Sequence, residues 1–142
     1  MRAVLLFSVF FSLLFSPAEL WAGNTSALES DRAISKALQI LEQLDVMEGE
    51  LVWESGTLLF KTRYNKESWI ALQQVRRLSY GALLSRELRT INHKSSYYFS
   101  PDGSYFIVQF LSAFSNKQET VETVILDAND PTSWKIVDIR MN

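Results

Sequence analysis

Residues 101–127 read PDGSYFIVQFLSAFSNKQETVETVILD, two apolar runs that are each preceded by a turn. Pro101-Asp102-Gly103 is a strong β-turn signal, and residues 105–114 after it are rich in aromatic and β-branched side chains. A second turn over residues 115–118 leads into the run over residues 119–127, and this pattern predicts an antiparallel pair of strands. The first run is apolar on both parities, so we expect a central strand that is covered on both faces.

Strand-like patterns continue on both sides of this pair. Upstream, polar and apolar residues alternate over residues 84–91, which is typical of a half-buried strand. Downstream, Asn129-Asp130-Pro131 marks a turn, and residues 134–141 form the last strand-like run. Four consecutive strands with short turns predict an antiparallel meander.

Helical spacing dominates the part of the chain before residue 82. Ser26 and Glu29 form a capping box, and the apolar residues that follow recur at helical spacing, so we expect a helix over residues 27–44. Residues 47–63 have a weaker pattern that two glycines interrupt. This second segment predicts one frayed helix or two short ones.

A third helix is predicted between Asn65, which can start it, and Gly81, which can close it. We expect one of its sides to be buried and the other exposed. The expected buried residues are Trp69, Leu72 and Val75, and the expected exposed residues are Gln73, Arg76 and Arg77. The predicted fold class is therefore α+β, with N-terminal helices packed on one side of a curved four-stranded antiparallel meander.

The N-terminus has the three regions of a secretory signal peptide. Arg2 supplies a positive charge, residues 3–15 are predominantly apolar, and Ala22-Gly23 offers small residues at a cleavage point. The apolar run has about 13 residues, whereas a bilayer span needs about 20, so we expect no membrane span. We predict a signal peptide over residues 1–22, a single α+β domain over residues 23–142, and a periplasmic or secreted bacterial protein. The alternative is an uncleaved N-terminal anchor.

Composition narrows the classes of partner and cofactor. The formal net charge of −2 gives no long-range attraction for nucleic acid or for anionic lipid. Cysteine is absent, so the exported domain would be stabilised by its core without disulfides. One histidine without cysteine does not favour a zinc site, and no glycine-rich phosphate loop is present. We therefore predict no metal, no cofactor and no nucleic-acid partner.

The second half of the chain carries an ordered series of motifs. The series comprises Trp69, Tyr80-Gly81-Ala82, Ser85-Arg86, the run from Pro101 to Phe110, Ser112, Phe114, Asn116-Lys117, Val121-Glu122-Thr123 and Trp134. Over residues 69–137 the chain resembles the Domain of Unknown Function 4019 family, whose members are small secreted bacterial proteins. The resemblance implies a fold similar to the nuclear-transport-factor-2-like cone, in which helices pack into a curved sheet, and it implies no activity.

Two charged residues fall on strand faces that are otherwise apolar. Arg86 shares its parity with Leu84 and Leu88. Glu122 shares its parity with Val124. A buried charge without a partner costs several kcal/mol, so Arg86 and Glu122 form a candidate pair in the cone interior, and a structural ion pair is the favoured interpretation. Two alternatives remain: one of the two faces points outward, or Arg86 binds a ligand beside the carboxylate.

No other residue makes a stronger catalytic candidate. His93 lies in a polar stretch at a strand end, so we expect a solvated loop residue rather than a catalytic base. Asp138 could enter the cone mouth and act with Glu122 as a paired acid and base, but a solvent-facing aspartate is the favoured interpretation. The aromatic run over residues 97–99 could mark a contact patch. We predict no catalytic residue.

The sequence therefore favours an exported, non-catalytic binding or interaction module. The alternative is a small cone enzyme that acts on an apolar small molecule, with Glu122 or Asp138 as the proton carrier. A third alternative is a homodimer formed through the open sheet face. An open pocket with an unpaired carboxylate would favour the enzyme, and a filled interior would favour the module.

Overall fold

The computed structural model describes residues 17–142, with side chains from residue 26 onward. Arg2 and the apolar run over residues 3–15, on which the predicted signal peptide depends, lie outside the described residues. Within residues 17–142, four helices precede four strands. The helices are α1 (Pro17–Asp45), α2 (Gly49–Glu54), α3 (Leu58–Arg63) and α4 (Lys66–Tyr80), and the strands are β1 (Leu83–Lys94), β2 (Tyr105–Phe114), β3 (Lys117–Asp127) and β4 (Lys135–Met141).

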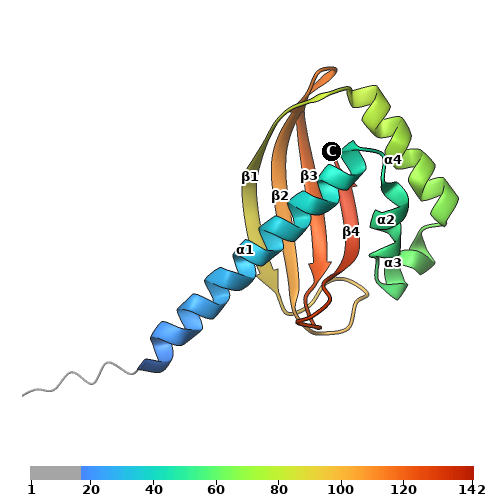
Figure 1. Ribbon diagram of the computed structural model, residues 1–142. Coiled ribbons are helices and arrows are strands. Elements are labelled where there is room, and N and C mark those ends of the chain that lie inside the picture. Colours follow the sequence, from blue (N-terminus) through green and yellow to red (C-terminus); the bar gives the residue numbers. More distant parts are fainter. Residues whose placement is uncertain (1–16) are drawn as a thin grey trace, which may run out of the picture.

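The strands form one antiparallel sheet in the order β1-β2-β3-β4, which confirms the predicted meander. Figure 1 shows the helices gathered on one face of this curved sheet, with α1 crossing it diagonally. The α+β class is therefore confirmed. None of the described helices combines the length and the apolar character needed to cross a bilayer.

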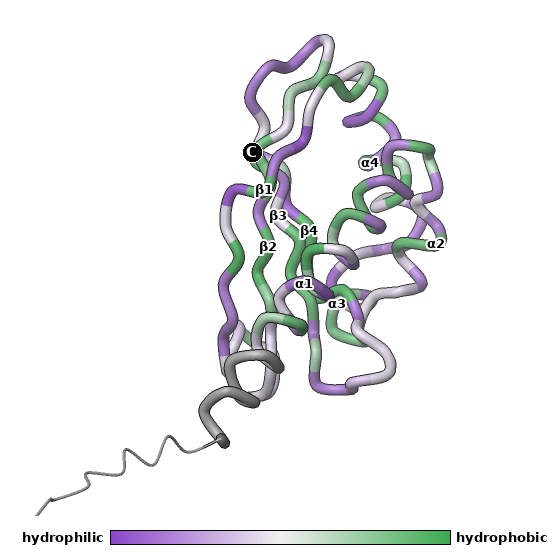
Figure 2. Tube along the Cα trace, turned by 60° about the vertical axis from the view of Figure 1, so that its left-hand side comes forward, coloured by the Kyte–Doolittle hydropathy of each residue, from purple (hydrophilic) through white to green (hydrophobic). Residues whose placement is uncertain are grey.

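Strand β2 is central, because it pairs with β1 on one side and with β3 on the other. Its helix-facing residues are buried, but on the opposite face Leu111 is 42% exposed. The expectation that β2 is covered on both faces is therefore wrong for part of its length. In Figure 2 the hydrophobic colour is nearly continuous along β2, whereas β1 at the sheet edge includes long hydrophilic stretches.

The first helix begins ten residues earlier than predicted. α1 starts at Pro17, and the capping box at Ser26 lies inside it. Proline is tolerated in the first turn because the N–H of that position would have no partner in the helix. No proline follows to stop the helix before Asp45, so the local capping signal did not determine where it starts.

The two short helices and the start of α4 follow the predicted signals. The weak segment forms two separate helices, α2 and α3. The side chain of Asn65 accepts a hydrogen bond from the Ser68 N–H at 3.0 Å and caps α4. Gly81 ends α4 with φ 78°, in the left-handed region that favours glycine.

The core lies between the helices and the sheet. Residues of α1 such as Ala37, Ile40, Leu41 and Leu44 pack with Phe60, Trp69, Phe106, Val108, Phe110, Val124, Leu126 and Ile136. A smaller cluster on the opposite face of the sheet contains Tyr97, Tyr105, Ile125 and Val137. The loop between β1 and β2 therefore covers one end of a sheet face that is otherwise open.

The faces of α4 differ from those predicted. Leu72 and Val75 are exposed, whereas Gln73 and Arg77 are 3% and 4% exposed. Together with Trp69, these two polar residues recur every four positions and form the face that meets the sheet. For Arg77 the assignment from hydrophobicity was wrong because this residue pairs with Glu122 of β3. The buried side-chain oxygen of Gln73 has no hydrogen-bond partner among the described residues.

Candidate functional site

Arg86 of β1 and Glu122 of β3 come together on the helix-facing side of the sheet. Arg86 Nε lies 2.6 Å from Glu122 Oε2. Ser112, on β2 between them, donates a hydrogen bond to the same carboxylate oxygen at 2.6 Å. The register explains this geometry, because Arg86 lies opposite Ser112 on the neighbouring strand. Neither residue points outward, so the outward-face alternative is wrong.

Two helical residues complete a cluster that the sequence analysis did not identify. Arg77 Nη1 lies 2.8 Å from Glu122 Oε1 and 3.0 Å from Asp45 Oδ1. Arg86 binds both oxygens of Asp45, at 2.8 and 3.2 Å. We call Asp45, Arg77, Arg86 and Glu122 the buried charge cluster. It joins α1, α4, β1 and β3, and it contains two charges of each sign.

The electrostatics of this cluster favour its ionised form. The side chain of Glu122 is fully buried, and the side chains of Arg77 and Arg86 are 3% and 5% exposed. Burial raises the pKa of the Glu122 carboxyl, but the hydrogen bond from Arg86, the charges of both arginines and the hydrogen bond from Ser112 outweigh it and leave this pKa below its usual range. Glu122 is therefore held as a carboxylate.

Part of the Arg77 guanidinium has no hydrogen-bond partner among the described residues. Its Nε and Nη2 atoms are buried and unpaired. The guanidinium carbon lies 5.5 Å from the centre of the Phe114 ring, so a cation–π contact partly offsets the missing hydrogen bonds. Arg77 is thus fixed between an aromatic ring and two carboxylates.

Asp138 is buried, with 2% exposure, so the interpretation of a solvent-facing aspartate is wrong. Its carboxylate accepts hydrogen bonds from the Tyr64 hydroxyl and from Arg140 Nε, both at 2.9 Å, and Arg63 lies 3.5 Å away. A bulge in the pairing of β4 with β3, which the strand parity does not reveal, lies next to Asp138. Asp138 shares no partner with Glu122, so the structure does not bring the two together as an acid–base pair.

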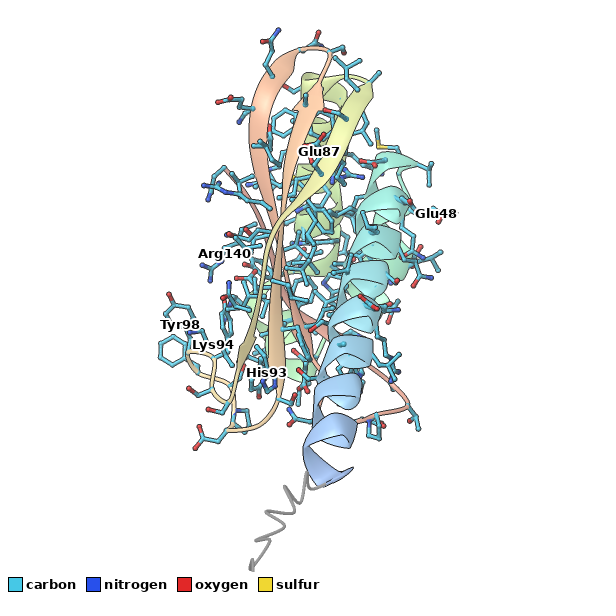
Figure 3. The ribbon with its side chains drawn as sticks, turned by 90° about the vertical axis from the view of Figure 1, so that its left-hand side faces the viewer. Glu48, Glu87, His93, Lys94, Tyr98 and Arg140 are labelled. Carbon is cyan, nitrogen blue, oxygen red and sulfur yellow. The ribbon has the colours of Figure 1, made fainter. Side chains whose placement is uncertain are left out.

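His93 lies at the end of β1 rather than in a loop. It is exposed, its Nε2 is 2.9 Å from Ser104 Oγ, and its ring centre is 4.8 Å from that of Phe106. Beyond it, Tyr98 and Phe99 are 76% and 86% exposed. Figure 3 shows Tyr98 and Lys94 on the side of the sheet away from α1.

The interior carboxylates differ in how far they are reached from the surface. Neither Glu122 nor Asp138 lines any of five prominent pockets on the part of the chain that the structure describes. Over the same residues, no three histidine, aspartate or glutamate side chains gather as metal ligands would. Asp45 and Arg77 of the buried charge cluster line a pocket of about 270 Å³ beside Phe114, and the Asp45 side chain is 20% exposed. The cluster therefore ties helices to the sheet and reaches the surface at Asp45, but not at Glu122.

These features define a small α+β protein in which helices cover one face of a four-stranded antiparallel sheet and buried charges join the two layers. The chain belongs to the family described as Protein of unknown function (DUF4019), which it matches over residues 36–138. This confirms the family resemblance and extends it upstream into α1. No curated protein and no solved structure matches the chain.

Proposed function

We propose that this protein is an exported, non-catalytic binding module of the bacterial periplasm. One observation carries the proposal: Glu122 and Asp138, the two carboxylates considered as proton carriers, are each bound by two arginines, and neither lines any of the five surface pockets. A general acid or base must reach its substrate and change its protonation state near the working pH. Glu122 and Asp138 are placed for structure instead.

The curved sheet with helices on one face supports a cone of the nuclear-transport-factor-2-like type, as the family resemblance implies. In this protein the space between the layers is filled by the apolar core and the buried charge cluster. Binding would then use the outer surface of the domain. The alternative of an enzyme that acts on an apolar small molecule would need an accessible carboxylate inside.

The carboxyl ¹³C chemical shift of Glu122, followed by NMR against pH, tests this proposal. Because Arg86, Arg77 and Ser112 stabilise the carboxylate, we expect its titration to lie below the ordinary range of a glutamate. The signal can be assigned by its disappearance in Glu122→Gln. A titration between about pH 5 and pH 8, where general acids and bases operate, would overturn the non-catalytic assignment.

Export is tested separately, by mass spectrometry of periplasmic material from a bacterium that expresses the full chain. We expect a mature N-terminus at Gly23 or within a few residues of it. Such a cut would remove the first six residues of α1, Pro17 to Ala22. Intact Met1 in the membrane fraction would support the uncleaved anchor and contradict the cleaved signal.

A homodimer through the open sheet face is the second candidate. Leu111 is 42% exposed on that face, and Ile107, further along the same face of β2, is only half-buried. Light scattering should then report a dimer that Leu111→Lys converts to a monomer. A wild-type monomer at the highest accessible concentration would exclude this arrangement.

A further inference from the structure

A surface pocket of about 410 Å³ lies outside the buried charge cluster, where three distant parts of the chain meet. α1 contributes Arg32 and Lys36, and the start of β4 contributes Lys135. The connection between α2 and α3, with Lys61 just beyond it, forms a third wall, and Trp134 lies in the pocket beside Lys135. We call this the basic pocket. Its volume is within the ordinary range for small-molecule sites.

Backbone hydrogen bonds hold the walls of the basic pocket together. The Thr57 N–H donates to the Ile136 carbonyl at 2.8 Å, and the Ile136 N–H donates to the Ser55 carbonyl at 3.0 Å. These bonds fix the α2–α3 connection against β4. The floor is also ordered, because Trp134 stacks on Phe106 with ring centres 5.2 Å apart. The pocket is therefore built before any ligand arrives.

The charge of the basic pocket is unbalanced although the protein as a whole has a net charge of −2. Four basic side chains line it, against one acidic side chain, Glu54. Glu54 binds Lys61 at 3.3 Å and also Lys66 at 2.8 Å, so its charge is already shared. The other basic residues, Arg32, Lys36 and Lys135, form no ion pair with any described residue.

Acidic groups outside the lining do not remove this excess. Asp130 is near enough to Lys135 for their charges to attract, and its carboxylate also accepts hydrogen bonds from the backbone N–H and the hydroxyl of Thr132, at 2.8 and 2.7 Å. With Asp130 counted beside Glu54, four basic side chains still face two acidic ones. Like charges gathered in one concave site repel one another and concentrate positive potential there. An anion bound among them would relieve that repulsion.

Arg32 is oriented to take part in such binding. Its guanidinium carbon lies 4.7 Å from the centre of the Trp134 ring. A guanidinium held over an aromatic ring keeps its N–H groups free to bind two oxygens of one anion. The flexible lysines can then supply point charges from the other walls.

We propose that the basic pocket binds a phosphomonoester. A phosphate monoester carries close to two negative charges at neutral pH and three acceptor oxygens, which matches several basic groups better than a single carboxylate does. The phosphate would lie among Arg32, Lys36 and Lys135. This assignment deepens the proposed function, because it rests on the protein being a binding module and names a site and a ligand class for it.

The test is a ¹H–¹⁵N NMR titration of the mature protein with glycerol 3-phosphate, with sodium chloride at matched ionic strength as a blank. We expect saturable changes in the amide chemical shifts of Gly56 and Ser133, which both line the pocket. Lys36→Gln/Lys135→Gln should bind roughly tenfold more weakly or worse, since it removes two charge-assisted hydrogen bonds.

The matched control is Arg89→Gln/Lys117→Gln, which removes the same number of positive charges as the pocket variant. Its two positions lie on β1 and β3, outside the pocket. It should bind within about twofold of wild type, as expected for distant surface charges. Thermal unfolding of both double variants checks that they fold. Equal weakening in the two would show non-specific charge attraction and would overturn the site.

A second arm separates a free phosphate from a lipid headgroup. Vesicles of phosphatidylcholine with and without phosphatidic acid, whose headgroup is a phosphomonoester, are sedimented with the protein. Binding to the phosphatidic acid vesicles that Lys36→Gln/Lys135→Gln abolishes, without shifts from glycerol 3-phosphate, would identify a lipid source. No saturable response to either probe would refute the proposal, while the Glu122 titration would still stand as a separate test of non-catalytic function.

Discussion

The substitution Glu122→Gln unbalances the buried charge cluster with almost no change of shape. It leaves Arg77 and Arg86 in the interior with Asp45 as their only carboxylate. Removing one partner from a buried ion pair costs about 3–5 kcal/mol, because the remaining charge has been taken from water without compensation. That is a large part of the total of about 5–15 kcal/mol that stabilises a typical domain. Urea unfolding at pH 7, followed by circular dichroism, measures the loss.

A double variant distinguishes charge balance from a general loss of packing. Arg86→Met combined with Glu122→Gln leaves Arg77 and Asp45, whose atoms lie 3.0 Å apart, as one charge of each sign. The loss of unfolding free energy in this double variant should be smaller than the sum of the losses in the two single variants by more than about 1 kcal/mol, since coupled sites are not additive. Glu87→Gln, at an exposed position of β1, is the control and should change stability by no more than about 0.5 kcal/mol. A single-variant cost below about 1 kcal/mol, or full additivity, would refute the reasoning.

The same substitution has a defined pH dependence. The pKa of Glu122 is lower in the folded protein, so its contribution is fully present above the unfolded pKa of about 4.3 and is lost as the pH falls through the folded value. The stability difference between wild type and Glu122→Gln should therefore persist at pH 5 to 7 and narrow only below about pH 4. A difference that has already disappeared near pH 6 would contradict the ionised state of Glu122.

Three further outcomes are expected. His93→Ala should change the unfolding free energy by less than about 1 kcal/mol, because the ring is exposed and its main contacts are Ser104 and Phe106; a larger loss in urea unfolding would show a structural role. Backbone amides along β2 should be among the slowest in hydrogen exchange, because this strand is hydrogen-bonded to β1 on one side and to β3 on the other. Amide exchange as fast as at the chain termini would contradict its central place. Gly81→Ala should cost at least about 1 kcal/mol, because φ is 78° and a Cβ would collide with Ser115 Oγ. An unchanged melting temperature would mean that the helix end adjusts freely.

Several elements could be predicted from the sequence because their signals are local. Strand runs, turn residues and the cap at Asn65 act within a few positions, and the structure contains the four-stranded meander and the helix that they predict. Parity along single strands also placed Arg86 and Glu122 on inward faces, where they meet. Bulges weaken such arguments: one beside Leu84 leaves that residue exposed, although it was expected to share a face with Arg86.

Other features depend on which distant segments meet, and no local pattern contains that information. From the sequence alone, Arg77 has the pattern of a solvent-facing helix residue. Its burial is energetically possible because Glu122 of β3 provides the opposite charge. Asp138 becomes buried because α3 and the residues after it bring Arg63 and Tyr64 to it. The sequence by itself determined the elements and their polarity, because hydrogen bonding and side-chain period are local. The tertiary structure alone decided which charges are neutralised in the interior and which gather unbalanced in the basic pocket, because electrostatic interaction depends on distance in space and not along the chain.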